Sequence, residues 1–132
     1  MVRTRTEKML RDFSSILSLF FTMLIVFLSL ENGSEVPQVK WIPFADKGLH
    51  ACAYAVLSFL VTIWFFKRGK LVRTFLLVVL YCFVLGVIME LLQPSFGRYR
   101  EFLDLVSDVV GCLIGFFLST FILCLYERRT NK

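Results

Sequence analysis

Charged residues are scarce in this chain and are confined to a few places. They make up 19% of the 132 residues and fall into short clusters, which leaves long stretches without any charge. The rest of the composition is 58% hydrophobic and includes fifteen Phe, which is more apolar surface than a soluble domain of this length buries. The composition therefore excludes a water-soluble globular domain and indicates an integral membrane protein.

Cysteine spacings typical of metal sites are also absent. The chain has four cysteines and no Cys-x-x-Cys pair; each lies in an apolar stretch, at Cys52, Cys82, Cys112 and Cys124. This pattern gives no indication of a zinc site or a disulfide framework. We interpret the four side chains as small hydrophobic groups in helix packing and expect no metal or other cofactor.

No long basic patch accompanies the formal net charge of +5. Lys and Arg instead flank the apolar stretches, as they do in membrane proteins. In a protein that binds nucleic acid, they would gather on one face of a folded domain. We therefore expect membrane lipids as partners and no nucleic acid.

Four apolar stretches are long enough to cross a bilayer. The first, residues 13–30, gives about 27 Å of helix at ~1.5 Å per residue. It is followed by Glu-Asn-Gly-Ser-Glu, which is unlike a signal-peptide cleavage site, so we interpret it as an uncleaved anchor. With the remaining spans, the prediction is a single all-α membrane domain over 1–132, a bundle of four transmembrane helices at about 13–30, 48–66, 74–92 and 103–126.

The distribution of Lys and Arg predicts the orientation of the bundle. Eleven lie in the N-terminal segment, the 67–73 turn and the C-terminal segment, against four in the opposite loops 31–47 and 93–102. Under the positive-inside rule both termini are cytoplasmic and those two loops face outward. The predicted location is the bacterial cytoplasmic (inner) membrane, with the chain crossing it several times.

Polar residues recur at helical spacing near the outward ends of three spans. Asp46, His50 and Tyr54 are spaced i, i+4, i+8 and fall on one stripe of the second helix. Gly86, Glu90 and Gln93 form a similar stripe on the third helix, with Pro94 marking its end. We expect Gly86, like the glycines of the fourth helix, to be a helix-packing position.

One stripe of the fourth helix carries two acidic residues followed by two glycines. Asp104, Asp108, Gly111 and Gly115 return to nearly one angular position. The Gly111-x-x-x-Gly115 pair allows another helix to approach closely, which would place both aspartates against a neighbour and away from lipid. The three stripes together predict a polar pocket that opens outward. The alternative is that each polar residue is only a solvated helix end.

Taken in order, these residues form a pattern with several parts: Asp46-Lys47-x-x-His50-x-x-x-Tyr54, Glu90-x-x-Gln93, Gly97-Arg98, Asp104, and the Gly111/Gly115 pair. Over positions 46–115 the chain resembles the VanZ-like family of bacterial membrane proteins. That family is named for a protein that raises resistance to the glycopeptide antibiotic teicoplanin, so the resemblance implies a cell-envelope role and no particular reaction. Asp108 stands where the family usually carries Asn, and it could pair with Arg98 or His50.

Three functions are compatible with these residues. The first is binding of a lipid headgroup or a glycopeptide antibiotic without chemistry. In it Arg98 and Arg100 meet phosphate, and His50, Glu90 and Gln93 orient the site. The predicted pocket comprises nine residues: Asp46, Lys47, His50, Tyr54, Glu90, Gln93, Arg98, Asp104 and Asp108.

The second is an intramembrane hydrolase or transferase acting on a lipid-linked envelope substrate. In this hypothesis His50, whose unperturbed pKa is about 6.5, is the general base. Glu90 or Asp104 orients it, or several of these carboxylates hold a divalent ion. The third is a structural network of ion pairs without a ligand. We favour binding over catalysis because the sequence has no recognised nucleophile motif and no metal-ligand spacing.

Overall fold

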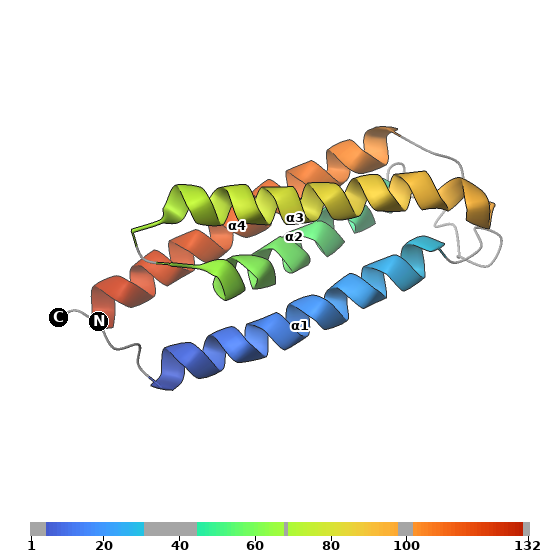
Figure 1. Ribbon diagram of the computed structural model, residues 1–132. Coiled ribbons are helices and arrows are strands. Elements are labelled where there is room, and N and C mark those ends of the chain that lie inside the picture. Colours follow the sequence, from blue (N-terminus) through green and yellow to red (C-terminus); the bar gives the residue numbers. More distant parts are fainter. Residues whose placement is uncertain (1–4, 31–44, 68, 98–101, 131–132) are drawn as a thin grey trace.

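The computed structural model describes residues 5–30, 45–67, 69–97 and 102–130, and these are almost entirely helical (Figure 1). The helices are α1 (Arg5–Leu30), α2 (Ala45–Phe65), α3 (Leu71–Leu92) and α4 (Phe102–Thr130), with a short 3₁₀-helix, η1 (Gln93–Phe96), after α3. Four helices are long and apolar enough to cross a membrane. The prediction of an all-α protein with four transmembrane helices is confirmed for the described residues.

Two of the helices extend well past the apolar stretches that predict them. α1 begins at Arg5 and not at Phe13, and α4 ends at Thr130 and not at Tyr126. An apolar stretch marks only the part of a helix that lies in lipid. Glu, Lys and Arg are good helix formers, so backbone hydrogen bonding continues through the charged segments beyond that stretch.

Large apolar side chains cover much of the outside of the bundle. On α1, Phe13, Phe20 and Phe27 are each more than 60% exposed, and Phe117 and Phe121 are equally exposed on α4. Exposure of so large an apolar surface to water would be unfavourable for a monomer. Contact with the hydrocarbon of a bilayer carries no such penalty.

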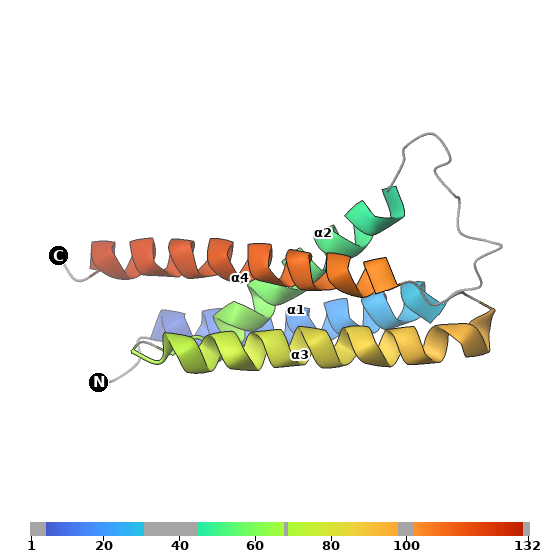
Figure 2. The same cartoon turned by 90° about the horizontal axis from the view of Figure 1, so that it is seen from above.

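The closest helix pair is α2 with α4, which run in the same direction. α2 also packs against α1 and α3, and it crosses the bundle at an angle (Figure 2). A Cβ added to Gly111 would overlap the backbone carbonyl of Ala51, and one added to Gly115 would overlap that of Ala55. The two backbones therefore touch, which is the close approach that the glycine spacing predicts.

Side-chain hydroxyl groups make hydrogen bonds between the helices of the bundle. Ser58 on α2 donates to the Cys112 carbonyl of α4 at 2.6 Å, and Ser14 on α1 donates to the Leu60 carbonyl at 2.6 Å. The hydroxyls of Thr22 and Tyr81 are 2.8 Å apart and join α1 to α3. These bonds satisfy polar groups that would otherwise be costly in hydrocarbon.

The bundle has two unlike ends. α1 begins, α4 ends and α2 turns into α3 at one of them; at the other, α1 and α3 end while α2 and α4 begin (Figure 1). We call the second the polar end. There Pro94 lies in η1, and Gly97, with φ of +74°, ends η1 by donating its N–H to the carbonyls of Gln93 and Pro94.

Candidate functional site

Four charged or titratable side chains meet where α2 and α4 begin. We call this group the polar cluster, and it consists of Lys47 and His50 from α2 and Asp104 and Asp108 from α4. The two aspartates are 3% and 4% exposed, so the cluster is buried at the polar end and not spread over its surface. The structure thus brings together four of the nine residues predicted to form the pocket.

The ammonium group of Lys47 pairs with Oδ1 of Asp104. The Asp104 side chain is almost fully covered, and that of Lys47 keeps 16% of its surface exposed. A buried carboxylate needs a cation and hydrogen bonds to offset the loss of its hydration. Lys47 supplies the cation for Asp104.

His50 lies between the two aspartates. Its Nδ1 is 2.9 Å from Oδ1 of Asp108, a hydrogen-bond distance, and its Nε2 is 3.8 Å from Oδ2 of Asp104, which is too long for one. Of the two partners that the sequence leaves open for Asp108, the structure shows His50. The described carboxylate that hydrogen-bonds to the imidazole is therefore Asp108, which the hypothesis of Glu90 or Asp104 as the orienting group does not name; Asp104 lies within ion-pair distance of the other ring nitrogen.

The register of α2 against α4 explains these pairings. Gly111 and Gly115 of α4 contact Ala51 and Ala55 of α2, each pair one helical turn apart. One turn nearer the polar end, the same two faces carry the polar cluster. The glycines hold the backbones together, and this forces the charged side chains of the next turn into contact.

α3 closes the third side of the site. A Cβ on Gly86 would lie 3.1 Å from Oδ2 of Asp108, 3.1 Å from Cδ1 of Leu105 and 3.6 Å from the Tyr54 hydroxyl. Glu90, one turn further along α3, is half-buried and within electrostatic range of that hydroxyl. Gly86, which the sequence suggests as a packing residue, therefore faces both Asp108 and Tyr54.

Two buried oxygen atoms near the polar end have no hydrogen-bond partner among the residues that the structure describes. They are the hydroxyl of Tyr54, whose side chain is 2% exposed, and Oε1 of Gln93, which is 1% exposed. Gln93 lies on the same stripe of α3 as Gly86 and Glu90. An unpaired buried polar group is destabilising, by about 1–3 kcal/mol, so each is a position where a further group would bind favourably.

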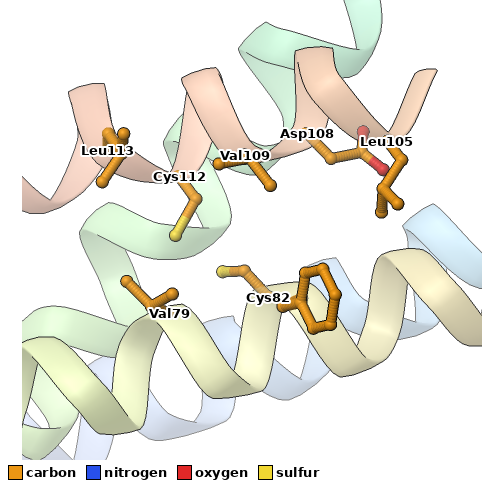
Figure 3. A pocket seen from close by; sticks show the side chains of 8 residues that line it. Val79, Cys82, Leu105, Asp108, Val109, Cys112 and Leu113 are labelled. Atoms are coloured by element: carbon orange, nitrogen blue, oxygen red, sulfur yellow. The ribbon is translucent and has the colours of Figure 1, made fainter. Parts of the chain in front are cut away.

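Two cavities lie between the helices in the described part of the chain. A narrow crevice of about 10 Å³ lies between α3 and α4, with Asp108 at one end and Cys82 and Cys112 further along (Figure 3). That volume holds about one water molecule. A larger apolar groove, about 430 Å³, lies between α1 and α3 and includes Tyr81, Leu85 and Ile88. Of the predicted pocket residues whose side chains are described, Asp108 alone lines either cavity.

Several features of the site were not predicted from the sequence. The thiols of Cys82 and Cys112 are buried side by side next to Asp108, a position that nothing in their spacing indicates (Figure 3). Among the described residues, no group of three or more His, Cys, Asp or Glu side chains is placed to hold a metal ion.

The structure describes contacts for only some residues of the VanZ-like pattern. Lys47, His50 and Asp104 meet as described, but Arg98 and Arg100 lie outside the described residues, as does the side chain of Asp46. In comparisons with known proteins, no family model matches the chain, and no curated protein or solved structure matches it significantly. Membership of that family thus stays a prediction from the sequence pattern.

Proposed function

We propose that this chain is a VanZ-like protein of the bacterial cytoplasmic membrane that binds an amphiphilic envelope ligand at its polar cluster. The ligand is an envelope lipid or a glycopeptide antibiotic such as teicoplanin. The observation that carries the proposal is the burial of two aspartates beside Lys47 and His50, next to a Tyr54 hydroxyl that has no hydrogen-bond partner within the described ranges.

The side of the membrane follows from the charge distribution. The end opposite the polar end carries eleven of the fifteen Lys and Arg residues, counting the 67–73 turn and both terminal segments. Under the positive-inside rule that end is cytoplasmic, and the polar cluster lies in the outer half of the bilayer. There it would meet lipids and antibiotics of the cell envelope.

Energetics favour a binding site over a scaffold. Removing a carboxylate from water costs several kcal/mol, while hydrogen bonds between membrane helices contribute about 0.6 kcal/mol each on average. The glycine contacts at Gly111 and Gly115 already hold α2 against α4. Buried ionisable groups in a membrane bundle most often serve function, so ligand binding is the better reason for them.

One observation favours catalysis as a second candidate. Asp108 is 2.9 Å from Nδ1 of His50 and can hold the imidazole in the tautomer that leaves Nε2 as a base. A base held in this way could serve an intramembrane hydrolase or transferase. It lacks an assigned nucleophile and a substrate position, so catalysis ranks below binding.

Retained lipid is the direct test of binding. The wild-type protein would be extracted from bacterial membranes in a mild detergent and its bound lipids measured by native mass spectrometry, beside His50→Gln and the control Asp12→Asn. Asp12 is an exposed carboxylate near the opposite end, so its amide should retain lipid like wild type. We expect His50→Gln to lose the bound species. Equal retention in all three proteins would contradict the proposal.

A parallel measurement separates the two candidate functions. Purified protein incubated with envelope lipid extract is followed for consumption of any lipid, and cells expressing the protein are tested for teicoplanin sensitivity. Binding predicts retention without turnover. Turnover that is abolished in both His50→Gln and Asp108→Asn would instead establish the enzyme.

A further inference from the structure

Two cysteine thiols face each other between α3 and α4. Cys82 and Cys112 are each 2% exposed, both line the narrow crevice, and their sulfur atoms point toward one another (Figure 3). The two thiols lie close enough to interact with each other. The other two cysteines, Cys52 and Cys124, are exposed. One protein thus offers a buried pair of thiols and two exposed thiols for comparison.

The register of α3 against α4 explains why the two thiols meet. The helices run in opposite directions, and Gly86 of α3 packs against the side chain of Asp108 (Figure 1). Cys82 lies one turn before Gly86, and Cys112 lies one turn after Asp108. In an antiparallel pair both steps lead toward the middle of the bundle, so the cysteines face each other there. A disulfide needs its sulfur atoms about 2.0 Å apart, and the glycine contact of the neighbouring turn favours that close approach.

A carboxylate at the end of the same crevice supplies a proton acceptor. Thiols buried in apolar surroundings are ordinarily inert, because only the thiolate attacks an oxidant. One oxygen of Asp108 is 2.9 Å from His50, while the other, Oδ2, faces α3. The crevice, about 10 Å³, has room for one water molecule that can pass a thiol proton to Asp108. The thiol pair therefore differs from an isolated buried cysteine.

The surroundings of the thiols limit which oxidant can reach them. Both α3 and α4 are long and apolar enough to cross a membrane, and the crevice between them is lined mainly by apolar side chains. Charged molecules are strongly disfavoured in hydrocarbon. A crevice with room for one water molecule also excludes bulky molecules. Hydrogen peroxide is small, carries no charge and accepts two electrons, so it meets both requirements.

We propose that Cys82 and Cys112 form an oxidation site inside the membrane, where hydrogen peroxide converts the two thiols to a disulfide that ties α3 to α4. One sulfur attacks a peroxide oxygen and the O–O bond breaks. The thiol proton, taken up by Asp108, leaves with the other oxygen as water. The second thiol then attacks the resulting sulfenic acid, the S–O bond breaks and a second water leaves. The two thiols lose two electrons, and one peroxide is reduced to two waters. This inference does not depend on the ligand-binding function proposed above.

Mapping of the cysteines after peroxide treatment tests the site in the wild-type protein. The full-length chain in lipid nanodiscs is treated with hydrogen peroxide, the remaining thiols are alkylated, and the digested peptides are analysed by mass spectrometry. We expect peptides linked through Cys82 and Cys112 of one chain, with Cys52 and Cys124 outside the link. Absence of this link, or an equal yield of links to the exposed cysteines, would overturn the proposal.

Two rate comparisons test Asp108 and the crevice, with oxidation of the exposed Cys124 in the same sample as the reference. Asp108→Asn should slow formation of the link at least tenfold relative to Cys124, because an amide does not take up the thiol proton. The bulky tert-butyl hydroperoxide should form the link at least tenfold more slowly than hydrogen peroxide on the same scale. An unchanged rate in Asp108→Asn would overturn the role of this carboxylate. An unchanged rate with the bulky peroxide would overturn entry through the crevice.

Discussion

The interface of α2 and α4 has two halves that do different work. In the half nearer the middle of the bundle, Gly111 and Gly115 rest on the backbone of Ala51 and Ala55 without any charge. In the half at the polar end, two aspartates are buried against Lys47 and His50. Close packing of the small residues therefore makes the contact between α2 and α4. The charged residues occupy positions that this contact brings together.

The largest effect should come from the half made of small residues. Gly111→Val would drive a side chain into the Ala51 carbonyl, and the two backbones would have to separate. We expect a loss of about 3 kcal/mol or more, enough to abolish the folded bundle, measured as loss of cooperative thermal unfolding in detergent. Gly48→Ala is the control because a Cβ there meets nothing within 4 Å. A stable Gly111→Val protein would contradict the role assigned to this contact.

The second effect concerns the paired charges. Lys47→Met would leave the carboxylate of Asp104 buried without its cation, which should destabilise the protein by about 3 kcal/mol. The double variant Lys47→Met with Asp104→Leu should recover most of that loss, since both charges are gone. Chemical unfolding of the wild type, the two single variants Lys47→Met and Asp104→Leu, and the double variant completes the double-mutant cycle. No recovery in the double variant would mean that the pair itself stabilises the fold.

Asp108→Asn should affect binding more than stability. The amide keeps nearly the same shape and can still hydrogen-bond to His50, but it removes the negative charge that faces α3. We expect the affinity for the retained envelope lipid to fall at least tenfold, about 1.4 kcal/mol, with a smaller change in unfolding temperature. An unchanged affinity would show that the ligand binds elsewhere.

The smallest effect is expected away from this interface. Thr22→Val removes the hydroxyl that joins α1 to Tyr81 of α3, and hydrogen bonds between membrane helices average about 0.6 kcal/mol. Ligand affinity should not change. A loss as large as that of Lys47→Met would show that the attachment of α1 matters more than the comparison of the two halves suggests.

The sequence predicts the helices well because the bilayer imposes a simple requirement. A stretch such as 13–30 must be helical in lipid, where no other partner for the backbone exists. The apolar stretch does not show that α1 begins at Arg5, because the part of a helix outside lipid depends on the helix propensity of its residues and not on their hydrophobicity.

The site is predicted in outline only. Spacing places Asp104, Asp108 and the two glycines on one stripe, and the structure has that stripe against α2. The pairing of each aspartate with Lys47 or His50 depends on the register between α2 and α4. The spacing of residues within one helix does not determine that register. For the same reason the sequence does not indicate that Cys82 and Cys112 are neighbours, or that Gly86 faces Tyr54.

Replacement of the whole polar cluster by apolar residues tests whether its charges form a binding site or stabilise the fold. The variant carries Lys47→Met, His50→Leu, Asp104→Leu and Asp108→Leu, and both its unfolding temperature and its bound lipid are measured. Exchange of buried ion pairs for apolar groups is often neutral or stabilising, so we predict a folded bundle, at least as stable as wild type, that retains no ligand. A variant that no longer folds, or one that folds and still binds the ligand, would contradict the claim that these charges form a binding site.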